Sequence, residues 1–147
     1  VASLSVHEVM NVVHVRSILE PEVARLASTS ISPHDLEVLW SVIHTMEEAV
    51  ENDDRMTWAK VDSRFHEILS ASCPNKLLGD MTIQVRNRIS FLSSDNQTNQ
   101  KRMLACTHEH RKVVEAIVAG DAQLAEQSMR EHLDKLRESF FRRLVLT

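Results

Sequence analysis

Apolar residues recur at three- and four-residue intervals along most of the chain, which is the spacing that places them on one face of an α-helix. Residues that typically start or end helices divide the pattern into segments. Ser32-Pro33 is typical of a helix start, Pro74 ends a helix, and Gly120 suits a left-handed C-terminal cap. We therefore predict a six-helix, all-α, antiparallel bundle. The predicted helices span about 5–28, 32–50, 54–72, 76–93, 101–119 and 121–144.

Two features interrupt this pattern. Pro21 falls inside the first predicted helix, where a proline removes a hydrogen bond and clashes with the preceding turn, so we expect a kink or a break there. Residues 93–100 are all polar and form the most loop-like segment. Neither feature marks a domain boundary, and residues 1–147 are interpreted as one domain.

The composition narrows the class of protein. A net charge of -4 over 147 residues argues against nucleic-acid binding by this chain alone, since duplex binding usually requires a basic patch. Apolar runs of only a few residues predict no contact with a membrane. Cys73 and Cys106 form no C-x-x-C motif, which favours reduced thiols in a cytoplasmic protein.

Polar residues on apolar faces provide the candidate chemistry. Asp62 and His66 stand four apart on the stripe that also carries Phe65, and a buried carboxylate and imidazole need partners. His110 and His132 also lie on apolar stripes. They flank the predicted turn at Gly120 at matching depths, roughly 15 to 17 Å along their helices at the usual rise.

We predict that Asp62, His66, His110 and His132 converge and hold a divalent metal ion. One carboxylate with neutral imidazoles suits zinc, nickel, iron, manganese or cobalt. The alternative is that each polar residue is an ordinary hydrogen-bonded core residue. His108 is predicted to face outward, because it aligns with charged residues of the same helix.

Several motifs resemble one family in content and order. They are Asp62-x-x-x-His66 within D-S-R-F-H, Glu109-His110, the segment A-I-V-A-G-D at 116–121, M-R-E-H-L at 129–133 and I-L-E-P-E-V-A-R-L-A at 18–27. This set resembles the FCD (FadR C-terminal) effector-binding domain of GntR-superfamily bacterial transcriptional regulators. The resemblance covers nearly the whole chain.

The resemblance implies an all-α domain of six or seven helices around a central ligand cavity, which forms a homodimer. It would normally follow a winged helix-turn-helix domain that is absent from this chain, so DNA would be bound only through that missing domain. The resemblance assigns metal binding to Asp62, His66, His110 and His132, with zinc as the first candidate, and places a small carboxylate effector beside the metal.

Three further residues are candidate effector contacts. Arg16 interrupts the apolar stripe of the first helix, and Arg88 shares a face with apolar residues of the fourth, one turn after Gln84. An inward guanidinium binds a carboxylate in a bidentate fork. Alternatively, Arg16 and Arg88 extend to the surface, or one of them pairs with an acid such as Glu20.

The predicted function is that of a sensor without catalytic residues, in which effector binding controls attachment to an operator. Two alternatives stay open. One is a metal-dependent, hydrolase-like enzyme, and the other is a metal-free helical interaction domain.

Overall fold

The structure is a computed structural model that describes residues 5–89 and 99–146, with side chains as far as residue 142. Over these residues it is entirely helical and contains no strand, which confirms the all-α prediction. No helix within the described ranges is long and apolar enough to cross a membrane. The helices are α1 (Val6–Ser30), α2 (Pro33–Glu51), α3 (Arg55–Ala71), α4 (Lys76–Asn87), α6 (Gln100–Val118) and α7 (Ala122–Leu146).

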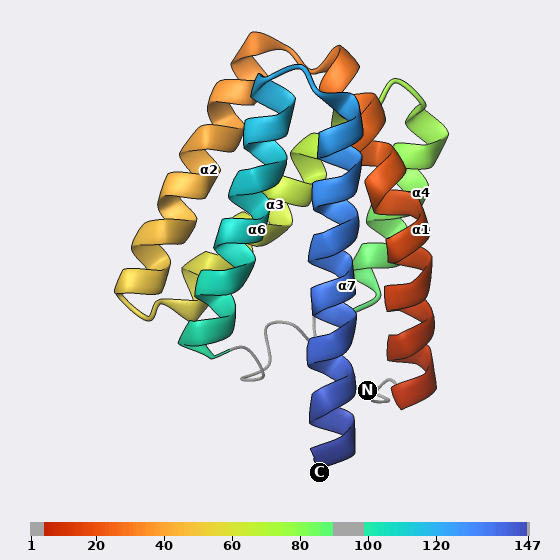
Figure 1. Cartoon of the computed structure of the whole chain (residues 1–147), viewed down its shortest axis with the longest axis vertical. Coiled ribbons are helices and arrows are strands. Elements are labelled where there is room, and N and C mark those ends of the chain that lie inside the picture. Colours follow the sequence, from red (N-terminus) through yellow and green to blue (C-terminus); the bar gives the residue numbers. More distant parts are fainter. Residues whose placement is uncertain (1–4, 90–98, 147) are drawn as a thin grey trace.

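The helices form a closed ring in which α1, α7, α6, α2, α3 and α4 each pack against the next, and α4 returns to α1. In Figure 1, α2, α6, α7 and α1 stand side by side across the front, while α3 and α4 lie behind them. The long helices α1 and α7 run antiparallel, so both chain ends lie at the same end of the molecule. The side chains that point inward from α1, α3, α6 and α7 therefore meet near the middle of the bundle.

Local sequence determines where the helices begin. Ser32, Asn75 and Asn99 each cap a helix by accepting a hydrogen bond from the backbone N–H three residues later, which satisfies a donor that the helix cannot satisfy itself. Between α6 and α7 the chain reverses at Gly120, whose φ of 70° is in the left-handed region that glycine adopts at low cost. This turn places α6 and α7 side by side.

One of the two outcomes expected at Pro21, a break, does not occur: α1 continues to Ser30, and Pro21 is buried within it. The packing of α1 against α7 and α4 outweighs the lost hydrogen bond. The fourth helix ends at Asn87, with Arg88 as its cap, rather than near residue 93. Most of the predicted loop at 93–100 lies outside the described residues.

The interior contains a large apolar cluster and a few directional contacts that fix the position of the helices. Trp58 of α3 donates its indole N–H to the Thr107 hydroxyl of α6 over 3.0 Å. Between α3 and α4 the backbones come so close that a Cβ at Gly79 would lie 2.4 Å from the Ser70 carbonyl oxygen. Only glycine permits this approach, which brings the far end of α4 against the middle of α3.

Candidate metal centre

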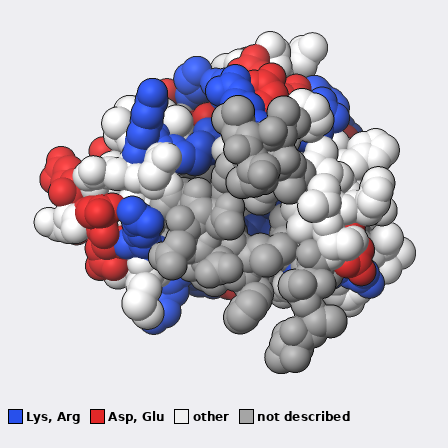
Figure 2. All heavy atoms as spheres, turned by 90° about the horizontal axis from the view of Figure 1, so that it is seen from below, with Lys and Arg blue, Asp and Glu red and all other residues white. Residues whose placement is uncertain are grey.

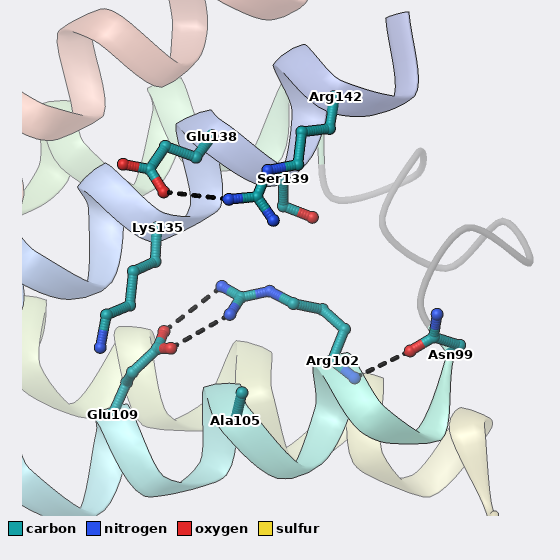
Figure 3. A pocket seen from close by; sticks show the side chains of 8 residues that line it. All are labelled: Asn99, Arg102, Ala105, Glu109, Lys135, Glu138, Ser139 and Arg142. Atoms are coloured by element: carbon teal, nitrogen blue, oxygen red, sulfur yellow. Dashed lines mark hydrogen bonds and ion pairs between the residues drawn. The ribbon is translucent and has the colours of Figure 1, made fainter. Parts of the chain in front are cut away.

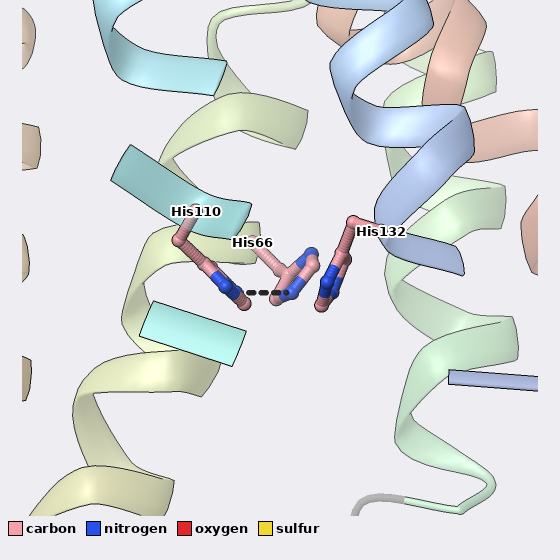
Figure 4. A group of neighbouring side chains, drawn as sticks. All are labelled: His66, His110 and His132. Carbon is pink, nitrogen blue, oxygen red and sulfur yellow. Dashed lines mark hydrogen bonds between the residues drawn. The ribbon is translucent and has the colours of Figure 1, made fainter. Parts of the chain in front are cut away.

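The structure brings together the four residues that the sequence singled out. Asp62 and His66 come from α3, His110 from α6 and His132 from α7, and all four are buried. One ring nitrogen from each histidine lies within 4.8 Å of the others. Figure 4 shows the three imidazoles turned toward a common point between the helices. The ring centroids of His110 and His132 are 4.5 Å apart, as their matching depths predict.

The two oxygens of Asp62 have different surroundings. Oδ2 accepts a hydrogen bond from Nη2 of Arg86 over 2.8 Å. Oδ1 lies 2.8 Å from His110 Nε2 and 3.5 Å from His66 Nε2, yet it is buried and accepts no hydrogen bond. A buried carboxylate oxygen without a hydrogen bond is costly, so this atom needs a positive partner.

Each of the three histidines is held through its Nδ1 atom. Nδ1 of His66 lies 2.7 Å from a carboxylate oxygen of Glu20, and Nδ1 of His132 lies 2.7 Å from one of Glu109. Nδ1 of His110 lies 2.6 Å from the carbonyl oxygen of Cys106. Because an oxygen acceptor at Nδ1 fixes the proton there, Nε2 of each neutral ring keeps its lone pair.

This arrangement has an electrostatic consequence. The Nε2 atoms of His66 and His110 lie 3.3 Å apart, and Oδ1 of Asp62 lies beside both. When both rings carry their proton on Nδ1, the two Nε2 lone pairs face each other and repel unless a proton or a metal cation lies between them. Imidazoles that are oriented by a carboxylate or carbonyl behind them are also the usual form of a histidine metal ligand. The residues therefore fit a divalent metal ion with one oxygen and three nitrogen donors.

The pKa shifts agree with this preference for positive charge. Burial acts to raise the pKa of Asp62, but the Arg86 guanidinium and the two imidazoles hold it well below its ordinary value. Burial acts to lower the pKa of His110, but the Cys106 sulfur and the Asp62 carboxylate outweigh it and raise that pKa to about 10. A proton therefore binds strongly beside Asp62, at the point toward which the donor atoms converge.

Arg16 is buried and faces the centre, as predicted. Its Nε donates to Glu20 over 2.5 Å, which is the pairing considered as the alternative role. The opposite oxygen of Glu20 accepts from His66. Burial opposes ionisation of Glu20, yet Arg16 and His66 keep its pKa below the ordinary value. Among the described residues, the side-chain hydrogen bond of Arg16 runs from Nε to Glu20.

The expected inward position of Arg88 and Gln84 is wrong, because both are exposed. Arg86 occupies the buried place instead, with only 4% of its surface exposed. The buried face of α4 is formed by Gly79, Thr82 and Arg86, none of which is apolar. Of the apolar residues that suggested an inward face, Leu77 and Met81 are exposed, whereas Leu78 and Val85 are partly buried and pack against the core.

Sequence reasoning also missed the residues behind the histidines. In the sequence, Glu109 stands out only as part of a motif, and Cys106 only as a reduced thiol. The sequence did show that Asp62 and His132 would need polar partners if they were buried. It could not show that these partners are Arg86 and Glu109. His108 is exposed, as predicted. The remaining histidines, His7, His14, His34 and His44, are exposed as well.

Comparison with known proteins identifies relatives. The chain is 29% identical over 137 residues to a probable D-xylose utilization operon transcriptional repressor of Paenarthrobacter nicotinovorans, covering 90% of this chain and 58% of that protein. It is 24% identical over 142 residues to the HTH-type transcriptional repressor RspR of Escherichia coli, covering 95% of this chain and 61% of the repressor. The galactonate operon transcriptional repressor of E. coli is 27% identical over 115 residues, covering 78% and 49%. The chain thus spans about three-fifths of the length of the first two relatives.

Solved structures share the fold. E. coli McbR/YncC matches with a TM-score of 0.84 at 17% identity, covering 97% of this chain and 72% of that one. A Streptococcus agalactiae GntR protein matches with a TM-score of 0.77 at 21% identity, covering 90% and 58%. The sequence profile of the FCD domain matches residues 11–135, which is most of the chain. The chain therefore belongs to the FCD domain family and is similar to the GntR-type transcriptional regulators that carry this domain.

Proposed function

We propose that the chain is the metal-dependent effector-sensing and dimerisation domain of a transcriptional regulator, with Asp62, His66, His110 and His132 as metal ligands. One observation carries the proposal. One ring nitrogen of each of the three histidines lies within 4.8 Å of the others, and the Asp62 oxygen that lacks a hydrogen bond lies beside two of them, His66 and His110. A divalent metal held there supplies a Lewis-acidic positive charge that binds a carboxylate oxygen.

The charge balance of the centre favours an anionic effector. The acids Glu20, Asp62 and Glu109 are matched by three guanidinium groups that contact them, so their formal charges cancel. A divalent cation among neutral imidazoles would leave two positive charges in a buried site, and such charges require compensation. A carboxylate effector supplies part of it. Arg16 is the proposed second anchor, because its guanidinium is buried and its contact with Glu20, a neighbour of His66, is made through Nε.

The named relatives suggest the class of effector. One is described as a repressor of a D-xylose utilization operon and another as a repressor of a galactonate operon. Galactonate combines a carboxylate with several hydroxyl groups, and we propose a sugar acid of this kind for the present chain. The carboxylate would be bound by the metal and by Arg16, while the hydroxyl groups meet the polar side chains around them.

The proposed control of DNA binding is a shift between two arrangements of the helices. The donor atoms come from α3, α6 and α7, and Glu20 of α1 supports one of them. An effector that binds one arrangement more tightly shifts the population toward it by the difference in affinity. In a dimer this shift alters the spacing of the DNA-binding domains that precede this domain in the family, and hence their match to an operator.

DNA contact is assigned to those preceding domains. The chain has a net charge of -4, and on the face shown in Figure 2 basic and acidic side chains are interspersed rather than separated. A duplex-binding surface would require a predominance of positive charge.

We propose that α1 and α4 form the dimer contact. They pack against each other, and both carry exposed apolar side chains. Leu77 and Met81 on α4 are 70% and 47% exposed, and Ile18 on α1 is 60% exposed. The outward apolar face of α4 lacks a partner within the described chain, and a second copy would cover it.

An enzymatic role is not favoured. Among the described residues, the three carboxylates around the centre are each engaged by a guanidinium and oriented toward an imidazole, so none is available as a general base. The relatives are described as transcriptional repressors.

Metal analysis and ligand binding test the proposal together. We expect about one divalent metal per chain after dialysis, and a rise in melting temperature with galactonate or a related sugar acid only in the metal-loaded chain. The ligand should be recovered unchanged, whereas an enzyme would convert it. His108→Ala is the control that should retain both properties. A chain that binds no zinc or nickel after chelator treatment would show that the metal-free alternative is correct.

A further inference from the structure

A polar hollow lies between α6 and α7, and Glu109, which contacts His132, forms part of its wall. It is open to solvent and has a volume of about 500 Å³. It is lined by Asn99, Arg102, Ala105 and Glu109 of α6 and its capping residue, and by Lys135, Glu138, Ser139 and Arg142 of α7. Figure 3 shows Arg102 from one helix facing Lys135 and Arg142 from the other. None of these residues is among the four proposed metal ligands.

Positive charge exceeds negative charge in this hollow, since three cations face two carboxylates. Arg102 donates to both oxygens of Glu109 over 3.1 and 3.3 Å, and Arg142 lies 3.8 Å from Glu138. Lys135 makes no ion pair with any residue that the structure describes. Lys135, Glu138 and Arg142 are exposed, so the hollow is open to solvent and an anion in solution reaches these cations directly.

We propose that this hollow binds a compact dianion, such as a phosphate ester or a dicarboxylate, through Arg102, Lys135 and Arg142. The volume admits a small ligand, and the two guanidinium groups and the ammonium approach it from opposite walls. Planar guanidinium groups bind carboxylates and phosphates in a fork, and an ammonium adds a compact positive charge. A ligand here relieves the mutual repulsion of the three cations.

The hollow is connected to the centre through one carboxylate. Glu109 accepts from Arg102 on the side of the hollow and lies 2.7 Å from Nδ1 of His132 on the inner side. An anion that draws Arg102 away makes Glu109 a stronger acceptor for the His132 N–H. This raises the basicity of the opposite nitrogen, which is the proposed metal-binding atom. The anion therefore strengthens metal binding, and by linkage the metal strengthens anion binding.

The binding step is tested on the metal-free chain, so that it does not depend on the proposed function. Inorganic phosphate and succinate are titrated separately, and binding is followed by calorimetry and by the amide resonances of α6 and α7. We expect saturable binding of at least one probe, and the stronger one identifies the ligand as a phosphate or a dicarboxylate. Lys135→Met should weaken it roughly tenfold by removing one charge-assisted contact.

Lys112→Met is the matched control, because Lys112 is an exposed lysine of α6 that does not line the hollow. Its affinity for the probe should equal that of the unaltered chain. Equal weakening in both lysine variants would overturn the proposal, because it would mean that the probes respond only to net charge. Failure of both probes to saturate would overturn it as well.

The effect of the anion on His132 through Arg102 and Glu109, called the relay here, rests on the proposed function and is tested separately. Bound anion should shift the imidazole resonances of His132 in the unaltered chain and leave them in place in Glu109→Gln, a variant that still contains all three cations. With nickel as the metal, a saturating anion should tighten metal binding roughly fivefold. Unchanged His132 resonances with the anion bound would refute the relay, whereas absence of nickel binding would refute the metal proposal and leave the anion result standing.

Discussion

Two regions of the interior are equally buried but are held together by different forces. Around Leu39, Ile43 and Met46 the side chains have no exposed surface, and only apolar contacts hold them. His110 and His132 are 1% and 3% exposed, and the Nδ1 atom of each makes a directional contact with one oxygen atom. The stability of the apolar region depends on the apolar surface that it buries. The stability of the polar centre depends on the geometry of its hydrogen bonds and ion pairs.

This difference predicts different responses to substitution. Removing apolar volume lowers the free energy of unfolding but changes no donor atom. Removing a polar group at the centre changes what can be bound there, while the helices around it persist because the apolar cluster supports them.

The first prediction concerns a ligand atom itself. His110→Ala should abolish metal retention, because it removes the nitrogen closest to the Asp62 oxygen that lacks a hydrogen bond. Far-UV circular dichroism should remain helical. Metal content after dialysis is the measurement, and His108→Ala is the control on the same helix. If His108→Ala lost the metal to the same extent, the inward face of α6 would not be the binding face.

The second prediction concerns the apolar region. Leu39→Ala should lower the free energy of unfolding by about 2–5 kcal/mol, the usual cost of a cavity at a fully buried leucine. The metal content of the folded fraction should not change. Chemical denaturation measures the first quantity, and Val118→Ala, at a position 51% exposed, should change it little. Loss of metal from folded Leu39→Ala would contradict the separation of the two regions.

The third prediction tests the support of Asp62. Arg86→Met should weaken metal binding by about 10–100-fold, because Asp62 loses the guanidinium that orients its carboxylate. Arg88→Met is the matched control, since Arg88 is two residues away and exposed. Competition with a chelator of known affinity gives the ratio. Equal affinities for the two variants would mean that Arg86 does not position Asp62.

The smallest effect is expected at the turn. Gly120→Ala should lower the free energy of unfolding by about 1 kcal/mol, because alanine pays a steric penalty at a φ of 70°. A Cβ there meets no atom within 4 Å, so no clash adds to this cost. Metal affinity should be unchanged. A loss much larger than this in thermal or chemical denaturation would indicate that the turn contributes contacts beyond its backbone conformation.

The fold could be predicted from the sequence, because apolar spacing and capping residues both act over a few neighbouring residues. The start at Ser32 and the turn at Gly120 follow from capping chemistry, which acts within a few residues. The break expected at Pro21 does not occur, because packing along α1 is a tertiary effect that no local rule contains. Three of the four proposed ligands were identified by the same means, as histidines on apolar stripes.

The failures at the site have one physical cause. Apolar spacing indicates which face of a helix avoids water, but it does not distinguish the core of this chain from the surface of a partner. On α4 the apolar residues Leu77 and Met81 face outward, so the pattern pointed to Arg88 instead of Arg86. The contacts of Glu20 with His66 and of Glu109 with His132 were not predicted, because in each pair the acid and the histidine lie on different helices.

The hydrogen bond between Trp58 and Thr107 provides the chain with its own optical reporter. Trp58 lies one turn before Asp62, and Thr107 lies three residues before His110, so this indole is placed close to the proposed ligands. The chain contains two tryptophans and no tyrosine, and Trp40 is the half-buried one. In Trp40→Phe, all tryptophan emission would therefore come from Trp58. A paramagnetic ion such as nickel would quench this light and zinc would not, so a simple fluorimeter could follow the loading of the site without a label.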